Sequence, residues 1–285
     1  MVLVQVIVSG LLIGSVYALF SSGLTLVWGM MNVINFAHGE FVMLGMYVAF
    51  WAFTLLQFGV TSFSVAAAVV LFILGVLVYV FLIRHVMRGP MLAQILSTFG
   101  LVLVLRYSAF WAFGANFVSL PEGILGPSLN LGGILLSAPK LVAGLTALAI
   151  TIGMHLLLTR TMLGSKILAV AENRNAAMLM GIKPDRMQAL AWGLSGASAG
   201  VAGALIATFF PISATVGESL GLIAFVVVTF GGFGSVPGAM LAGLIIGLIE
   251  SLSAYYFGPV YQDVFVYALF VLVLWIRPHG LMGKA

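Results

Sequence analysis

Few residues in this chain could do chemistry, and His38 and Glu40 are the first to test. They lie in the sequence GMMNVINFAHGE, residues 29–40, which also contains Asn32 and Asn35. Neither an H-E-x-x-H pattern nor a third ligand at helical spacing accompanies them, so no metal site is expected. The few carboxylates are scattered along the chain, which does not favour a nucleophilic triad. We therefore expect no catalytic residue and no enzyme.

Two interpretations remain open for these polar residues. Glu40 is either an intramembrane ionisable group with a function or a carboxylate that complements the dipole at a cytoplasmic helix start. His38 and Asn35 either hydrogen-bond a polar solute or satisfy the broken backbone around them.

The composition is that of a membrane protein. Of the 285 residues, 63% are hydrophobic and only 6% are charged, whereas an average globular protein is about one quarter charged. The net charge of +4 does not indicate nucleic-acid binding, because the basic residues fall between apolar stretches. The chain has no cysteine, which excludes disulfides and thiolate ligands. We expect a single transmembrane domain over residues 1–285.

Apolar stretches long enough to span a membrane follow one another along the whole chain. Spanning the hydrocarbon takes about 20 apolar residues in a helix, and the sequence predicts an all-α polytopic protein with about eight or nine such helices. The expected spans are residues 3–28, 38–58, 63–83, 91–113, 141–158 and 187–210, followed by shorter pieces at 220–230, 239–252 and 260–276.

The basic residues predict the orientation. The basic residues gather on one side of the membrane, which the positive-inside rule makes cytoplasmic. They are Arg84 with Arg88, those of the segment 159–186, and Arg277 with Lys284. The loop 114–137 contains Glu122 but no lysine or arginine and falls on the other side. The N-terminus is then outside and the C-terminus cytoplasmic, with nine crossings if residues 220–230 cross fully.

Two segments break the apolar pattern and are expected to be irregular or re-entrant. They are residues 29–40 and the sequence GGFGSVPG at 231–238. Irregular backbone at membrane depth is tolerated where it is buried in protein or lines a cavity, and paired breaks point to a translocation pathway in an inverted repeat. The predicted pathway residues are Asn32, Asn35, His38, Glu40, Gly232, Phe233, Gly234, Ser235 and Pro237.

The segment 159–186 is polar and predicts a short helix in water. Asn173 is the expected N-cap, residues 174–180 the helix, and Gly181 the left-handed C-terminal position. Asp185 and Gln188 have the spacing of a capping box for the next helix. Such a helix, showing Met178, Leu179, Met180 and Ile182 to water, suits a groove on a partner. The alternative is an ordinary cytoplasmic loop.

Three stretches together resemble the permease subunits of branched-chain amino acid ABC importers of the shorter LivH type. They are NFAHGEFVMLGMY at 35–47, AENRNAAMLMGI at 171–182 and GGFGSVPGAMLAGLIIGLIE at 231–250. The resemblance implies the inverted-repeat ABC importer permease fold in a bacterial cytoplasmic membrane. It also implies that 159–186 is a coupling loop similar to the E-A-A-x-x-x-G motif of such permeases, with Glu172, Asn173, Ala176, Ala177, Gly181 and Ile182 contacting the ATPase.

The resemblance further implies partners. They are a second, LivM-like permease, two ATPase subunits of the LivG and LivF type, and a periplasmic or lipoprotein substrate-binding protein. ATP and Mg²⁺ would be bound by the ATPase subunits, because this chain has no G-x-x-x-x-G-K-[ST] sequence and is expected to bind no cofactor.

Several alternatives stay open at this point. Related permeases carry urea, short amides or aromatic acids, and the permease pair is either a homodimer or a heterodimer. A different class, an ion-coupled secondary transporter or a channel, would also use broken helices. A membrane scaffold without transport activity is the third class.

Overall fold

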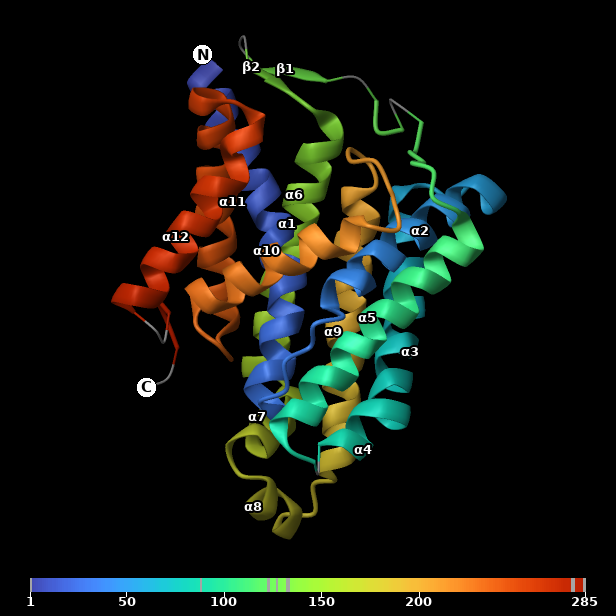
Figure 1. Cartoon of the computed structure of the whole chain (residues 1–285), viewed down its shortest axis with the longest axis vertical. Helices are drawn as coiled ribbons and strands as arrows, with labels where there is room; N and C mark the ends of the chain where they lie inside the picture. Colours follow the sequence, from blue (N-terminus) through green and yellow to red (C-terminus); the bar gives the residue numbers. More distant parts are fainter. Residues whose placement is uncertain are drawn as a thin grey trace.

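The protein is a bundle of long helices with a small β-hairpin (Figure 1). The computed structural model describes residues 2–87, 89–121, 124–126, 128–131, 134–277 and 280–283. Arg88, Glu122 and Lys284, which entered the predicted orientation, lie outside these residues. The helices are α1 (Val2–Met31), α2 (His38–Leu56), α3 (Val60–Val78), α4 (Arg84–Val86), α5 (Met91–Phe113), α6 (Ala138–Arg160), α7 (Met162–Glu172), α8 (Arg174–Leu179), α9 (Pro184–Ile206), α10 (Val216–Gly231), α11 (Val236–Phe257) and α12 (Gln262–Ile276).

Shorter elements complete the chain. A π-helical turn, Tyr79–Ile83, joins α3 to α4, and a 3-10 turn, Pro259–Tyr261, precedes α12. The strands β1 (Leu129–Leu131) and β2 (Ile134–Leu136) form an antiparallel hairpin in which Leu129 pairs with Leu136. The hairpin lies in the loop 114–137, where no regular structure was expected.

Within the described residues, eight helices are long and apolar enough to cross a membrane. The expected number, eight or nine, and the all-α class are confirmed. The span 91–113 was predicted with both ends correct. The additional helix, α10, has 16 residues and is therefore about 24 Å long, too short to cross about 30 Å of hydrocarbon by itself.

The molecule has two distinct ends (Figure 1). The N-terminus and the β-hairpin lie at one end, and α7 and α8 lie at the other. At the hairpin end, Val118 pairs with Ile212 in an isolated antiparallel bridge, which joins the loop after α5 to the loop after α9. We call the end with the N-terminus and the β-hairpin the hairpin end, and the end with α7 and α8 the α8 end.

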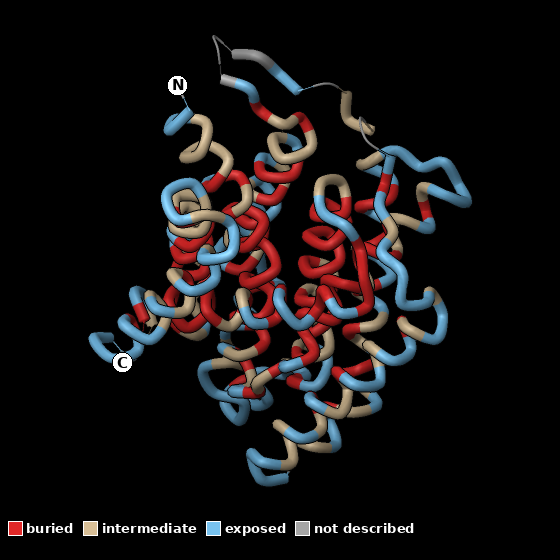
Figure 2. The backbone as a smooth tube through the Cα atoms, turned by 45° about the horizontal axis from the view of Figure 1, so that its top comes forward, coloured by how far each residue is buried: buried red, intermediate tan, exposed pale blue. Residues whose placement is uncertain are grey.

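The core is formed by four helix pairs that pack along one another, α1 with α11, α3 with α9, α1 with α9, and α2 with α9. Buried residues gather in the middle of the bundle (Figure 2). Small residues allow this close approach, since a Cβ atom added at Gly45 would lie 2.6 Å from the Gly200 carbonyl oxygen. These glycines therefore let the helix backbones approach closely.

One glycine contact gives a stability prediction. A Cβ atom at Gly243 of α11 would lie 2.6 Å from the Ala18 backbone nitrogen of α1, whereas one at Gly153 of α6 would meet nothing within 4 Å. Gly243→Ala is expected to lower the free energy of unfolding by about 1–3 kcal/mol through overpacking. Gly153→Ala, the matched control, should be neutral or stabilising by up to about 1 kcal/mol. Thermal unfolding of the purified variants in detergent measures both, and equal midpoints would contradict the packing described.

The sequence 196–200 reads G-A-S-A-G, the spacing of a hydrolase nucleophile elbow. It lies within the regular helix α9, and the Ser198 hydroxyl donates a hydrogen bond of 2.8 Å to the Ser195 carbonyl oxygen. An elbow requires a sharp turn between a strand and a helix, so these residues are helix packing and not a catalytic site.

Helices α1, α2 and α3 form one group, and α9, α10 and α11 form a second group with the same arrangement but the opposite direction along the bundle. Helix α1 runs from the hairpin end towards the α8 end, and α9 runs the opposite way (Figure 1). Helix α11 packs along α1 as α3 packs along α9, and α2 and α10 each follow a long helix after an irregular segment. The counterpart of the break before α2 is therefore residues 207–215. The pairing with 231–238 expected from the sequence is wrong, because α10 intervenes.

Candidate functional site

The chain turns back into the bundle after α1. His38, the first residue of α2, places its Nε2 atom 2.7 Å from the Phe20 carbonyl oxygen. Phe20 lies three helical turns before the end of α1 at Met31, a distance of about 16 Å along the helix. Helix α2 therefore begins inside the bundle, and residues 32–37 are a re-entrant connection.

The polar residues of this connection hold its backbone. Asn32 adopts a left-handed conformation with φ of 52° at the end of α1. The Asn35 side-chain oxygen accepts a hydrogen bond of 3.1 Å from the Ala37 N–H, and the His38 Nδ1 atom has no partner among the described residues. Asn35 and His38 are buried and Asn32 is exposed. These contacts support the structural interpretation, and a role in lining a pathway stays a prediction.

Glu40 is buried inside the bundle and paired with an arginine. Its Oε1 atom accepts hydrogen bonds of 2.7 and 3.1 Å from Arg106, and the side chains of Glu40 and Arg106 are 2% and 18% exposed. Glu40 lies in the first turn of α2, where a carboxylate complements the helix dipole as one of the two expectations has it, but this helix start is buried within the bundle. Helix α5 also contacts the re-entrant connection, through a 3.0 Å hydrogen bond from the Thr98 hydroxyl to the Ile34 carbonyl oxygen.

Arg106 was missed by the sequence analysis. It stands alone in the apolar stretch 91–113, and a charged residue inside a span is a functional candidate by default. The lone arginine of this stretch, together with Glu40, the lone acidic residue of the apolar stretch 38–58, was the signal that could have found the pair.

Arg106 also joins the two groups of helices, α1 to α3 and α9 to α11. Arg106 donates a second ion-pair contact of 2.9 Å to Glu218, whose side chain is 64% exposed. Glu40 is the third residue of α2 and Glu218 the third residue of α10. Each follows a glycine, in H-G-E and V-G-E, and Gly39 packs directly against Gly217 and Gly221. The starts of α2 and α10 thus meet, and Arg106 pairs with the carboxylate that each of them brings there.

The second break is organised by caps. Gly232 and Gly234 have φ of 97° and 80°, and the Ser235 hydroxyl accepts a hydrogen bond of 3.1 Å from the Gly238 N–H at the start of α11, next to Pro237. The Thr25 hydroxyl of α1 accepts a hydrogen bond of 2.8 Å from the Gly234 N–H. The Phe233 ring lies 4.5 Å from the Trp28 ring, measured between centroids.

The end of the chain covers this break. Leu281 and Met282 donate backbone hydrogen bonds of 2.8 and 3.0 Å to the carbonyl oxygens of Phe230 and Gly231. These are the last carbonyls of α10, which have no partner within the helix. Nothing in the sequence indicated that residues 280–283 return to satisfy them.

The predicted pathway residues form two groups. One is Asn35, His38 and Glu40 near the start of α2, and the other is residues 232–237 with Asn32, which follows the turn of α1 against which Phe233 and Gly234 pack. Gly39 and Glu40 contact Gly217 at the start of α10, and Gly232 follows its end. The length of α10 between Gly217 and Gly231 separates the groups by about 21 Å. That both groups line one pathway stays a prediction.

The segment at the α8 end folds as a capped helix. The Asn173 side chain accepts hydrogen bonds of 3.0 Å each from the Asn175 and Ala176 N–H groups. Gly181 has φ of 78°, its N–H bonds the Met178 carbonyl oxygen, and the Ile182 N–H bonds that of Ala177. This is the Schellman pattern. The expected N-cap and the left-handed glycine are confirmed.

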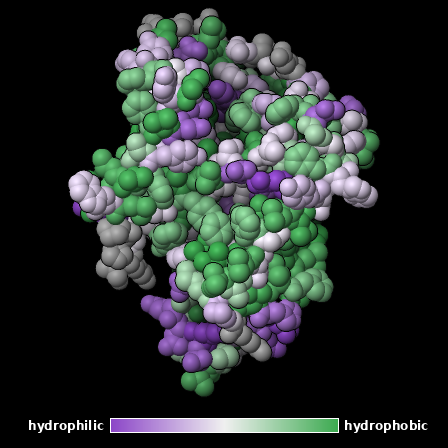
Figure 3. All heavy atoms as spheres, viewed as in Figure 1, coloured by the Kyte–Doolittle hydropathy of each residue, from purple (hydrophilic) through white to green (hydrophobic). Residues whose placement is uncertain are grey.

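Apolar side chains project from α8 into water. Leu179 and Met180 are 90% and 82% exposed, and Met178 is also exposed. Ala177 is buried and Ile182 is partly buried in the cluster that includes Ile167, so the expectation that Ile182 faces water is wrong. Hydrophilic residues surround this end of the molecule (Figure 3). Glu172 and Ala176 are exposed.

The predicted capping box at Asp185 and Gln188 is wrong. Helix α9 begins at Pro184, and neither side chain caps it. Asp185 accepts a contact of 3.1 Å from Arg174 of α8, and the buried Gln188 accepts a hydrogen bond of 2.8 Å from the Tyr79 hydroxyl. These contacts connect α8 to α9 and α9 to the end of α3. Helix α7, which was also not expected, connects α8 to α6.

No group of three or more histidine, aspartate or glutamate residues that could hold a metal ion occurs in the described part of the chain. The arrangement of polar residues is one of ion pairing and backbone support within a transmembrane bundle.

Comparison with known proteins decides the family. The family model described as "Branched-chain amino acid transport system / permease component" matches residues 6–274. The chain belongs to the branched-chain amino acid permease family. It is 34% identical to the high-affinity branched-chain amino acid transport system permease protein LivH of Escherichia coli strain K12 and to that of Salmonella typhimurium strain LT2. Each alignment covers 98% of this chain and 95% of the relative.

A third relative of this permease is the protein BraD of Pseudomonas aeruginosa, named as a permease protein of the same kind of high-affinity system. It is 32% identical over 98% of this chain and 95% of its own length. No solved structure matches the permease. As a member of this family, the permease is a transport subunit and not an enzyme, and it works as one component of a system.

Proposed function

We propose that this permease is the membrane-spanning subunit of an ATP-driven importer for branched-chain amino acids, coupled to separate ATPase subunits through α8. The observation that carries the proposal is the exposed apolar surface of α8, formed by Met178, Leu179 and Met180. A capped helix that presents apolar residues to water is suited to a groove on a partner. Its caps at Asn173 and Gly181 and its ion pair to α9 make it a rigid lever.

The α8 end is the cytoplasmic end in this proposal. It carries Arg160, Lys166, Arg174, Lys183 and Arg186, and Arg84 lies in α4. The positive-inside rule assigns such an end to the cytoplasm. The segment 207–215 and α10 together make a ninth crossing, which is supported by the contact of Phe233 with Trp28 near the α8 end of α1. The N-terminus is then outside and the C-terminus inside, in a bacterial cytoplasmic membrane.

The partners follow from the family and from what the chain lacks. No P-loop sequence is present, so two ATPase subunits of the LivG and LivF type supply the hydrolysis. A LivM-like permease completes the pathway, and a periplasmic or lipoprotein binding protein delivers the solute. The coupling residues are Glu172, Asn173, Ala176, Ala177, Gly181 and Ile182.

Movement passes from α8 into the bundle through packed helices. Helix α8 is joined to α7 and α9, and α9 packs along α3 and α1. A displacement of α8 by the ATPase therefore moves α9 as a unit. The pathway residues at the two breaks, at the start of α2 and at 232–237, are the places where irregular backbone allows the bundle to change its opening.

Uptake of radiolabelled leucine into proteoliposomes that contain the purified complex tests this proposal. Uptake is expected only with ATP inside the compartment that α8 faces, and with the binding protein on the other side. Competition by unlabelled urea, short amides and aromatic acids separates the substrate classes. Uptake by the permease alone, driven by an ion gradient and indifferent to ATP, would favour a secondary transporter instead.

A further inference from the structure

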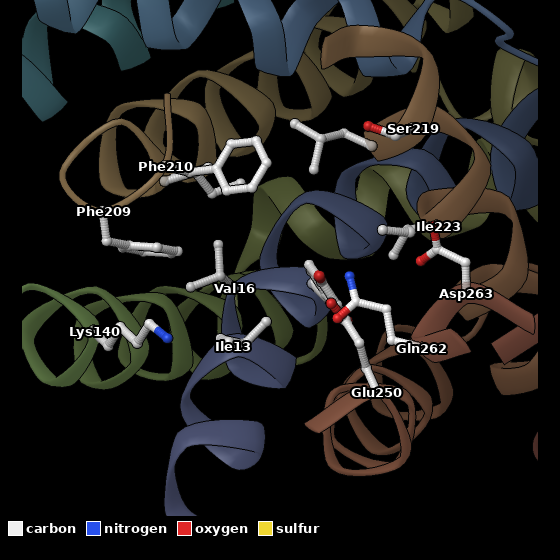
Figure 4. Close-up of a pocket in the computed structure, with 13 residues that line it drawn as sticks. Ile13, Val16, Lys140, Phe209, Phe210, Ser219, Ile223, Glu250, Gln262 and Asp263 are labelled. Carbon is white, nitrogen blue, oxygen red and sulfur yellow. The ribbon is translucent and has the colours of Figure 1, made fainter. Parts of the chain in front are cut away.

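A cavity of about 350 Å³ opens between α1, α6, α10, α11 and α12 (Figure 4). Its volume lies within the range of about 300–1,000 Å³ found for small-molecule sites. Its walls include Tyr17 and also Phe209 and Phe210 of the segment 207–215, and none of the predicted pathway residues lines it.

Charged groups of opposite sign line this cavity. Lys140 enters from α6 on one side, and Glu250 of α11 with Gln262 and Asp263 of α12 enter from the other (Figure 4). None of the three charged residues forms an ion pair with another described residue. The Glu250 Oε2 atom is buried without a hydrogen-bond partner in the described chain.

A buried carboxylate oxygen without a partner is costly. Leaving a buried charged acceptor unsatisfied destabilises a protein, and such groups are found paired or bound to a ligand. The hydroxyl of Tyr17 is a neighbour of the Glu250 carboxyl group, so the second oxygen remains for a donor that enters the cavity. A ligand with a cationic donor would satisfy it.

The surface between the charged groups is apolar. It is formed by branched and aromatic side chains, namely Ile13, Val16, Ile206, Phe209, Leu220 and Ile223. An aliphatic group placed there is removed from water, which contributes about 0.8 kcal/mol for each buried methylene.

A second cavity connects this site to the hairpin end. It shares Ile13, Lys140, Glu250 and Gln262 with the first and extends to Val2 and Gln5 at the start of α1. Hydrophilic residues surround a hollow in the upper part of the molecule in Figure 3. A small solute can therefore enter from the end opposite α8.

We propose that this cavity binds an α-amino acid zwitterion with an aliphatic side chain. The ammonium group is held by Glu250 and Asp263, the carboxylate by Lys140, and the side chain lies against Val16 and Ile223. The proposal rests on the proposed function, since it names a site for the transported solute inside this subunit.

The test uses Glu250→Gln and Lys140→Gln in the complete complex without its binding protein. Binding of radiolabelled leucine is measured by competition with leucine, with 4-methylpentanoate, which lacks the ammonium group, and with 3-methylbutylamine, which lacks the carboxylate. Each variant is expected to weaken leucine binding by about 10- to 100-fold, as for a lost charged hydrogen bond. Glu250→Gln should not weaken the binding of 4-methylpentanoate, and Lys140→Gln should not weaken the binding of 3-methylbutylamine.

The matched control is Gln94→Ala, a partly exposed residue of α5 that lines neither cavity. It should bind leucine as the wild type does. Wild-type affinity and analogue selectivity in both charge variants, or no saturable leucine binding by the wild-type complex, would overturn the cavity assignment. Failure of the proposed function is seen separately, as the absence of ATP-driven leucine uptake by wild-type proteoliposomes with binding protein present.

Discussion

Arg106→Met is expected to destabilise the permease by about 3–5 kcal/mol and to abolish uptake. Removing one member of a buried ion pair leaves the other charge uncompensated. Here the remaining charges are the buried Glu40 and the nearby Glu218, which the starts of α2 and α10 bring together. Unfolding of the purified chain in detergent measures the stability, and proteoliposome uptake measures the function.

Two variants control this experiment. Glu218→Gln removes the exposed member of the cluster and should cost no more than about 1 kcal/mol, as for an exposed ion pair. Arg106→Met combined with Glu40→Gln removes both buried charges and should recover much of the stability lost in Arg106→Met. An equal loss in the single and double variants would mean that Arg106 acts through packing and not through its charge.

Gly181→Val is expected to abolish ATP-driven uptake while the permease stays in the membrane. Gly181 has φ of 78°, a conformation that a β-branched residue adopts at a cost of about 1–2 kcal/mol or more. Nothing lies within 4 Å of a Cβ atom placed there, so the strain is confined to the backbone that ends α8. If the backbone at position 181 changes its conformation to release that strain, the exposed side chains of Leu179 and Met180 leave the positions in which α8 holds them.

Gly181→Asn is the matched control, since asparagine tolerates the left-handed conformation. It should retain most of the wild-type uptake, with both variants present in the membrane at equal amounts. Equal uptake by Gly181→Val and wild type would show that the geometry at the end of α8 does not matter for coupling.

The elements that depend on local sequence could be predicted. Apolar length gave the span 91–113, and an asparagine followed by a helix and a glycine gave the caps of α8, because capping groups act on the nearest backbone. The same local reading failed at Asp185, where the side chain pairs with Arg174 instead of capping α9.

The features that depend on distant segments could not be predicted in this way. Arg106 and Glu40 are 66 residues apart in the chain, and their pairing depends on how α5 packs against α2. Two further features depend on the assembled bundle in the same manner. Residues 280–283 return to the end of α10, and Lys140 and Glu250 line the same cavity. The repeated G-E at 39–40 and 217–218 is a sequence trace of the inverted relation, visible once α2 and α10 are compared.

The absence of cysteine in the natural chain makes one measurement especially direct. Leu179→Cys introduces a single cysteine at the most exposed large hydrophobic residue of α8. A second variant, Phe117→Cys, places it in an exposed position of the loop after α5. A thiol-specific cross-linker is applied in the native membrane, and the captured chains are identified by mass spectrometry. Coupling through α8 predicts that Leu179→Cys captures an ATPase subunit with a P-loop and that Phe117→Cys does not. Capture of no ATPase from position 179, in membranes that carry out ATP-driven leucine uptake, would contradict it.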